Sequence, residues 1–392
     1  MAATASAKDS GERPIGGSFY ARLEAGQPTA RPSRGEEGPL RQRTATLFWR
    51  RLDAGLPPMD SGEDMSTGKP MDLVSRLAAA DRTVEAPAMP RVAPLLALAT
   101  SPTLHRVLPR RLADLLGEAR GVMLWHTRPH VREEARATME TILGGTERAH
   151  EAGALARRRV LDSQALRMMF WQPPRRASMD ERSTANLAAA LSSGRGILLS
   201  SCHMGPFWDV AAPLVGAGPR VYLVSGDWFF GVPGADYAGR RLAYWWRRVA
   251  GRKFHLILAS KSYATIRAVL ERGDVALLFF DLPGSRETVF LRKPVSLATG
   301  TARLAVDANA LVLPARARRD GGGARVDIGA ALDPDDFADA DQLHEALARI
   351  HTDSILELSE TLEDPRREVA WQHGASGEAW VSPHQPQAPR SS

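Results

Sequence analysis

One short segment of this 392-residue chain combines residue types that could activate an alcohol. The apolar run 197–202 ends in His203, and Gly205 and Pro206 precede Asp209. A neutral imidazole can take a proton from a hydroxyl near neutral pH when an acceptor holds its second nitrogen. Asp209 is the nearest carboxylate in the sequence that could be that acceptor. The segment therefore predicts a catalytic dyad in which His203 is the general base and Asp209 orients it.

The surrounding pattern predicts where this dyad lies. The apolar run is short and bounded by glycines, which favours a buried strand, and Pro206 predicts a helix that begins directly after it. His203 then lies at the carboxyl end of a strand, the edge at which open α/β sheets bind ligands. A Cys202–His203 nucleophile pair is one alternative, although neighbours on a strand point to opposite faces. A hydrogen-bonded structural role for His203 is the other.

A second apolar run, residues 274–280, ends in Asp281 and is followed by Gly284 and Arg286. With the order His, Gly, Trp and acid around His203, this block resembles the bacterial lipid A biosynthesis acyltransferases. These are the lauroyl and myristoyl transferases, and related enzymes acylate glycolipids and lysophospholipids. The helix start at Gly300 and the apolar run 310–314 also lie where that family has them. The resemblance covers roughly residues 130–371.

The resemblance implies a glycerolipid-acyltransferase-like α/β fold and transfer of a fatty acyl chain to a hydroxyl. The donor would be acyl-CoA or an acyl carrier protein, and the acceptor a lipid or glycolipid. No metal and no cofactor are implied beyond the acyl thioester, which is a co-substrate. The resemblance gives Arg286, together with Asp281 and Gly284, a place in binding the substrate or the developing oxyanion.

Two positions depart from the family pattern. Family members have four residues between the histidine and the acid, whereas five separate His203 from Asp209, which would turn the acid by about 100° on a helix. Many members also carry an arginine after the next strand, where this chain has Leu223 and Val224. Arg286, Arg240, Arg241 or backbone N–H groups would then stabilise the oxyanion. A catalytically inactive, membrane-associated lipid-binding relative is the alternative function.

The segment 239–248 mixes arginines, including Arg240 and Arg241, with tyrosine and tryptophan. Such a helix is expected either to bind the phosphates of an acyl carrier or a membrane surface, or to pack its aromatic rings in the core. The net charge of +6 also favours an anionic partner. Nucleic-acid binding is an alternative that rests on this charge alone, and no nucleic-acid partner is expected.

The single cysteine excludes a disulfide framework and favours a reducing compartment. Neither a secretory leader nor a spanning helix is expected, because the first 20 residues lack a basic start followed by an apolar stretch and no apolar run reaches about 18 residues. Together with the resemblance to the lipid A acyltransferases, this implies a peripheral protein on the cytoplasmic face of the bacterial inner membrane. Four regions are predicted: a disordered extension (1–70), an amphipathic helical lead-in (71–129), the acyltransferase domain (130–372) and a loose tail (373–392).

Within the domain, apolar runs alternate with amphipathic stretches, which predicts an α/β fold. We expect a largely parallel mixed sheet covered by helices on both faces. Strands are expected at 196–202, 220–225, 254–259, 274–281, 310–316 and 324–329, the last two joined by a hairpin turn. Helices are expected at 130–145, 148–170, 181–192, 206–216, 235–250, 261–272, 300–309 and 337–362.

Overall fold

The computed structural model describes residues 70–82, 85–174, 177–225, 237–259, 262–321 and 323–362. Residues 1–69 of the predicted extension and the predicted tail 373–392 lie outside these ranges. Within them, no helix is both long and apolar enough to cross a membrane.

A six-stranded sheet forms the centre of the fold, in the order β3-β2-β4-β1-β7-β8. All neighbouring pairs are parallel except β7 and β8, which form an antiparallel hairpin. The predicted mixed, largely parallel sheet is confirmed, and its expected strands differ from the observed ones mainly at their ends. The strands are β1 (Ile197–Ser201), β2 (Val221–Ser225), β3 (His255–Leu258), β4 (Val275–Phe279), β7 (Leu311–Asp320) and β8 (Gly323–Ile328).

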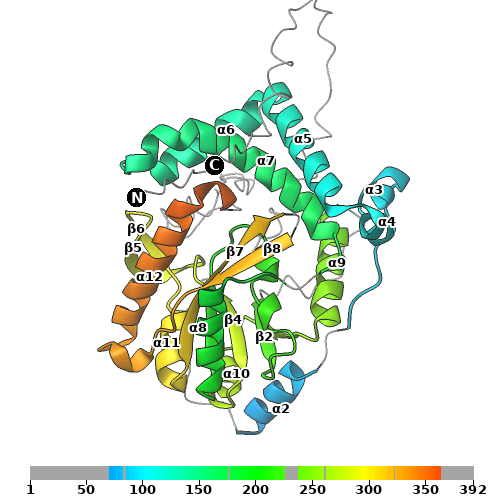
Figure 1. Cartoon of the computed structure of the whole chain (residues 1–392). Coiled ribbons are helices and arrows are strands. Elements are labelled where there is room, and N and C mark those ends of the chain that lie inside the picture. The colour runs from blue at the N-terminus through cyan, green and yellow to red at the C-terminus, as the bar shows by residue number, and fades with distance from the viewer. Residues whose placement is uncertain are drawn as a thin grey trace, which may run out of the picture. The chain divides into compact units, whose positions relative to one another are not determined.

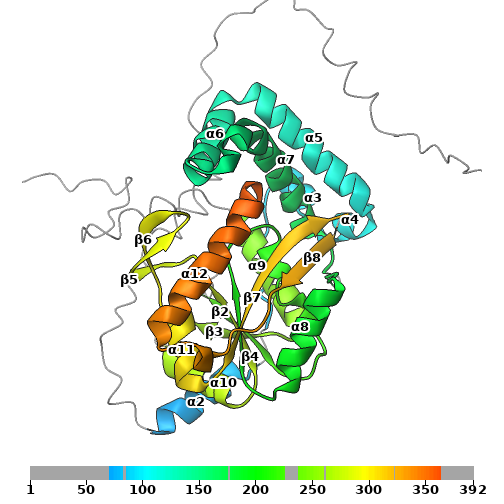
Figure 2. The same cartoon turned by 60° about the vertical axis from the view of Figure 1, so that its left-hand side comes forward.

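Helices cover both faces of this sheet, as predicted (Figures 1 and 2). Alternate residues of β1 divide between two cores, since Leu198 packs with α10, α11 and α12 while Leu199 packs with α8 and α9. The helices are α2 (Pro70–Ala80), α3 (Pro94–Ala99), α4 (Pro102–Val107), α5 (Arg110–Thr127), α6 (Pro129–Leu143), α7 (Ala152–Trp171), α8 (Glu181–Ser192), α9 (Tyr237–Gly251), α10 (Tyr263–Glu271), α11 (Gly300–Ala308) and α12 (Ala340–Glu357).

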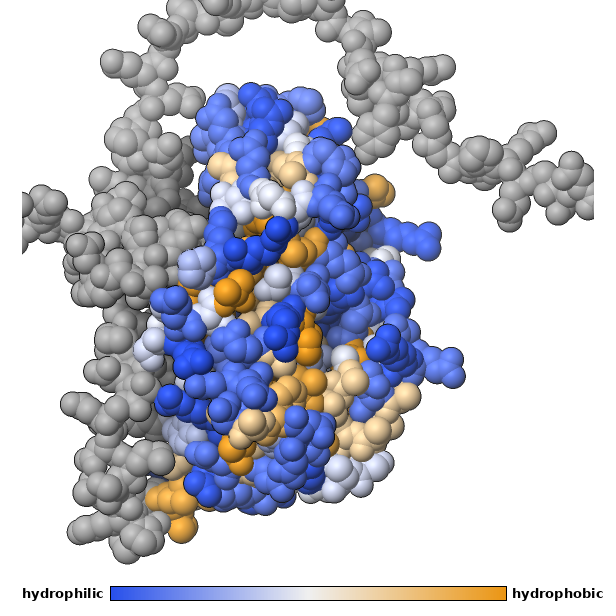
Figure 3. All heavy atoms as spheres, turned by 90° about the vertical axis from the view of Figure 1, so that its left-hand side faces the viewer, coloured by the Kyte–Doolittle hydropathy of each residue, from blue (hydrophilic) through white to orange (hydrophobic). Residues whose placement is uncertain are grey.

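A separate hairpin, β5 (Pro283–Phe290) and β6 (Lys293–Leu297), packs against α12. Thr288 donates to Glu345 at 2.7 Å, and the Leu291 N–H donates to Thr352 at 3.1 Å. On the side that carries α11, α12 and this hairpin, hydrophilic and apolar side chains are interspersed (Figure 3).

Helices α5, α6 and α7 pack together beyond the carboxyl end of β7 (Figures 1 and 2). Arg319 near that end contacts Glu118 on α5 and Asp162 on α7, each at 2.7 Å. A Cβ at Gly121 of α5 would lie 2.7 Å from the Cα of Leu161 on α7, so the two helices approach closely.

The prediction of a helix over 206–216 is wrong. The segment forms two single 3₁₀ turns, Phe207–Asp209 and Ala212–Leu214. Pro213 explains the difference, because inside an α-helix its ring would clash with the carbonyl of Asp209 and it has no N–H to donate. The expected helix 337–362 is likewise shorter: α12 ends at Glu357, and a 3₁₀ turn follows at Ser359–Thr361.

Candidate active site

His203 lies two residues beyond the carboxyl end of β1, which β4 and β7 flank. In the parallel β1–β4 pair, Ser201 lies opposite Phe279, so His203 and Asp281 come side by side two residues further on. Nδ1 of His203 lies 2.7 Å from Oδ1 of Asp281, and the His203 backbone N–H donates to Oδ2 at 2.9 Å. The carboxylate therefore holds both the ring and the backbone of the histidine.

Asp281 also determines which nitrogen of the ring is basic. An ionised carboxylate only accepts hydrogen bonds, so Nδ1 carries the proton in this contact and Nε2 carries the lone pair. The Asp281 side chain is fully buried, whereas that of His203 is 14% exposed. A proton taken up at Nε2 would create an imidazolium beside a buried negative charge, which stabilises it.

Aromatic rings fix the orientation of the imidazole. The His203 ring lies 3.9 Å from the Phe279 ring, centroid to centroid, at an interplanar angle of 30°. The ring centroid of Phe207 lies 5.0 Å from that of His203, and the ring centroid of Trp208 lies 5.3 Å from that of Phe207. These apolar neighbours limit rotation of the ring and reduce water around it.

The structure does not bring Asp209 to His203, and the predicted contact between them is wrong. The Asp209 carboxylate instead contacts Arg248 at 3.0 Å and Arg252 at 2.7 Å, with all three side chains buried. Burial lowers the pKa of Arg252, and the charge of Asp209 opposes that effect. Because residues 207–209 form a 3₁₀ turn, the acid is directed toward α9 and ties that helix to the segment after His203.

Arg286 and Gly284 lie on the β5–β6 hairpin. The Arg286 guanidinium pairs with Asp341 of α12 at 3.0 Å and is partly exposed. A Cβ at Gly284 would lie 2.4 Å from the Cα of Ala298, so glycine is required where the hairpin begins. Both contacts hold the hairpin in place, and a role in substrate binding stays a prediction for Arg286.

The two arginines predicted on α9 have different surroundings. Arg240 is buried, and its guanidinium donates to Thr100 at 2.7 Å and to the Pro90 carbonyl at 2.8 Å. It fastens the segment before α4 to α9 and is directed away from solvent. The Arg241 guanidinium carbon lies 4.7 Å from the Phe170 ring centroid and 5.9 Å from that of Trp208. Arg241 thus belongs to the aromatic group that continues from Phe207.

A buried histidine that was not predicted from the sequence contacts β1, the strand that precedes His203. Nε2 of His351, on α12, is 2.8 Å from Oγ of Ser200 on β1. Burial lowers the pKa of His351 to about 4, while the charge of Asp281 acts in the opposite direction. His344, one heptad earlier on α12, is buried as well. This spacing on the inward face of a helix is the signal in the sequence that could have revealed the pair.

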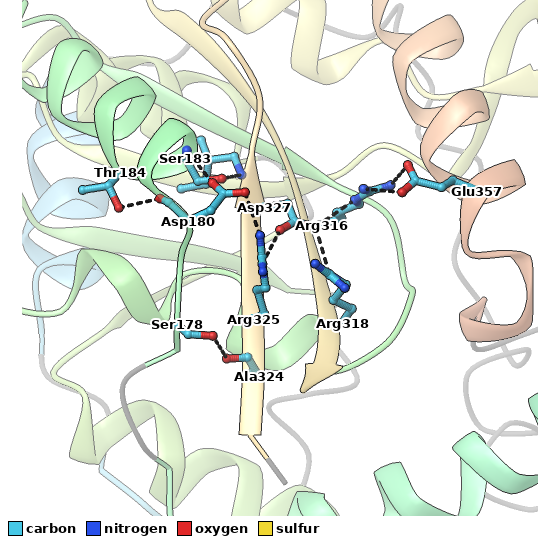
Figure 4. A network of polar contacts seen from close by, with 11 residues as sticks. Ser178, Asp180, Ser183, Thr184, Arg316, Arg318, Ala324, Arg325, Asp327 and Glu357 are labelled. Atoms are coloured by element: carbon cyan, nitrogen blue, oxygen red, sulfur yellow. Dashed lines mark hydrogen bonds and ion pairs between the residues drawn. The ribbon is translucent and has the colours of Figure 1, made fainter. Parts of the chain in front are cut away.

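The loop after His203 packs against β7. Gly205 has a φ of 56°, and a Cβ there would lie 2.3 Å from the Ala317 carbonyl oxygen, so only glycine fits. Beside this contact, Arg316, Arg318 and Arg325 converge on Asp327 (Figure 4). Glu357 and Asp180 pair with Arg316 and Arg325, respectively, so three carboxylates balance the three cations.

Cys202 is buried in the core with Leu198, on the side of the sheet opposite Phe279. This confirms that its thiol points away from the His203 ring and removes the geometric basis for a Cys–His nucleophile pair. Among the described residues, no group of three or more His, Cys, Asp or Glu side chains could hold a metal ion.

No protein-family model matches the chain, and no curated protein sequence matches it either. Among solved structures, the chain is similar to the 1-acyl-sn-glycerophosphate acyltransferase PlsC from Thermotoga maritima. The identity is 13% and the TM-score 0.33, and the match covers 64% of this chain and 98% of that one. At this level of similarity, the functional argument depends on the geometry of the site itself.

Proposed function

We propose that this protein is an O-acyltransferase that moves a fatty acyl chain from acyl-CoA or an acyl carrier protein to a hydroxyl group of a lipid or glycolipid. The observation that carries the proposal is the His203–Asp281 pair at the carboxyl ends of β1 and β4. A histidine held in one tautomer by a buried carboxylate suits the removal of a proton from an alcohol.

In the proposed reaction, Nε2 of His203 takes the hydroxyl proton while the acceptor oxygen attacks the thioester carbonyl carbon. A C–O bond forms, and the tetrahedral intermediate then collapses with cleavage of the C–S bond. The departing thiolate takes the proton from the imidazolium, so the base is regenerated and no acyl-enzyme forms. Asp281 orients His203 and stabilises its charged form.

Arg241 and Arg286 are the side chains proposed to meet anionic groups of the substrates. Arg241 adjoins the aromatic group that contacts His203, and Arg286 is partly exposed on β5. Arg240 and Gly284 are not included in the proposed site, because each makes close contacts with other parts of the chain. The role proposed for Asp281 is to orient His203, in place of the substrate-binding role that the resemblance implied.

The test is acyl transfer by the purified full chain from long-chain acyl-CoA, or from acyl carrier protein, to a bacterial lipid extract. Thiol release and acylated lipid are both measured. His203→Ala is expected to reduce transfer by roughly 10²-fold or more, because the general base is lost. His130→Ala, a change at an exposed histidine of α6, is the matched control and should retain transfer. Lipid binding without thiol release in the unaltered protein would indicate an inactive relative and contradict the proposal.

A further inference from the structure

Helix α5 packs mainly small residues inward, with Trp125 the large residue on its buried face, and it exposes three leucines and a methionine on the other side. Its inward face packs on α7 through Ala113, Gly117 and Gly121. A helix that serves only the protein core normally buries its leucines instead. At 100° per residue, the outward residues form one stripe about 100° wide opposite the packed face. This outer stripe, 44–61% exposed, consists of Leu112, Leu115, Leu116 and Met123.

Cations border the outer stripe, and the acids of α5 are turned away from it. Arg111 and Arg120 are exposed, and the helical spacing places one on each side of the stripe. Asp114 and Glu118, the acidic residues of α5, both point to Arg319 on β7, at 3.7 Å and 2.7 Å. The outward face of α5 therefore carries leucines and arginines, whereas its acidic side chains point toward Arg319.

The two short helices before α5 also expose apolar side chains and carry no acidic residue. Figures 1 and 2 show α3 and α4 beside the N-terminal end of α5. Neither helix contains an acidic residue, and Arg106 on α4 is exposed. Their exposed large apolar side chains are 39–82% accessible: Leu95, Leu98, Leu104 and Val107.

We infer that the outer stripe of α5, continued by α3 and α4, docks on the surface of an anionic lipid bilayer. The apolar side chains of a stripe this wide enter the boundary between lipid headgroups and acyl chains. The arginines on both borders of the stripe reach anionic headgroups. A second copy of the chain fits less well, since a two-fold contact would bring the same arginines together. The helix lies in the interface plane, consistent with the absence of a membrane-spanning helix from the described residues.

The position of the stripe links it to the candidate active site. Arg319, which holds α5, lies near the carboxyl end of β7, and the loop after His203 packs on the same part of β7. A docked bilayer would thus lie beyond the end of the sheet at which His203 is found. The inference itself does not depend on acyl transfer, because it uses only exposure and charge.

The experiment is co-sedimentation of the full chain with vesicles of phosphatidylcholine alone or of an equimolar mixture with phosphatidylglycerol. We expect binding to the mixed vesicles that weakens with salt. The double variant Leu112→Gln/Leu116→Gln should lower the affinity by about tenfold or more, since two half-exposed leucines lose their burial in lipid. Arg111→Gln/Arg120→Gln should lower it by roughly 30-fold on mixed vesicles and little on phosphatidylcholine.

Two controls change one exposed apolar residue and one exposed arginine on other helices: Val306→Gln on α11 and Arg349→Gln on α12. Both should bind as the unaltered chain does, and so should His203→Ala, which separates docking from acyl transfer. The inference is overturned if the unaltered chain ignores both vesicle types or if the stripe variants bind normally. A dimer that the leucine variant abolishes, without vesicle binding, would also overturn it and assign the stripe to a second copy.

Discussion

Ser201 lies directly opposite Phe279 in the parallel β1–β4 pair, and this register selects the carboxylate that reaches His203. Both strands end at these residues, so the chain positions two residues further on meet above the edge of the sheet. His203 and Asp281 are 78 residues apart in the sequence and 2.7 Å apart in the structure. The sheet, rather than a local helix, therefore builds the candidate dyad.

The first prediction concerns Asp281→Asn, which keeps the shape of the side chain and removes its charge. The amide can donate to Nδ1, which would place the proton of neutral His203 on Nε2, the wrong nitrogen for a base. We expect kcat for acyl transfer to fall by about 10³–10⁴-fold, as such changes in catalytic histidine–aspartate pairs do, with a smaller effect on KM. Steady-state kinetics on folded protein, verified by circular dichroism, would measure this. Near-normal kcat would refute the proposed role of Asp281.

Local patterns were sufficient to predict most elements. The run 274–281 predicted β4, observed at Val275–Phe279, and the stretch 181–192 predicted α8 with the observed bounds. Short apolar runs bounded by turn residues and the 3.6-residue period act within a few neighbours, so they can be read without knowledge of the tertiary structure. The position of His203 at a strand end was accessible in the same way.

The partner of His203 was not accessible from local patterns. Proximity in the sequence favours Asp209, but strand order and register decide which residues meet at a sheet edge, and no single segment encodes them. Pro213 is a local signal against a helix over 206–216, and it agrees with the observed 3₁₀ turns. The contact of Ser200 with His351 spans 151 residues, so it too depends on the docking of α12.

The second prediction is that Asp209→Asn affects stability far more than chemistry. It removes the negative charge that faces Arg248 and Arg252 in a buried position, so two cations would be left without their carboxylate. We expect the free energy of unfolding in urea to fall by about 3–5 kcal/mol. Asp336→Asn, at an exposed position, is the control and should stay within about 0.5 kcal/mol. An unchanged urea midpoint for Asp209→Asn would show that the buried pairs contribute nothing.

The third prediction compares one chemical change at two glycines. Gly121→Ala adds a methyl group where the Cα of Leu161 is 2.7 Å away, so α5 must move off α7, and we expect a loss of about 1–3 kcal/mol in unfolding free energy. Gly153→Ala, at an exposed position of α7 with open space around it, should gain about 0.5 kcal/mol from reduced freedom of the unfolded chain. Opposite signs in urea unfolding are expected. Equal effects would contradict the close approach of α5 and α7.

The fourth prediction is that the buried histidine behind the dyad makes the fold sensitive to acid. Burial holds the pKa of His351 at about 4, below its ordinary value of 6.5. Between these two values the unfolded chain binds a proton that the folded chain does not, so the free energy of unfolding rises with pH across this window. The contribution is complete above pH 6.5 and is on the order of 3 kcal/mol.

Urea unfolding of His351→Gln between pH 4 and pH 7 would measure this contribution. Glutamine can still hydrogen-bond to Ser200 but does not titrate, so its stability should depend less on pH than that of the unaltered chain. Burial also lowers the pKa of His344, which leaves part of the slope in the variant. His130→Gln, at an exposed position, should keep the full slope. If His351→Gln keeps it as well, His351 is not held neutral by burial, and the acid sensitivity must arise from other groups.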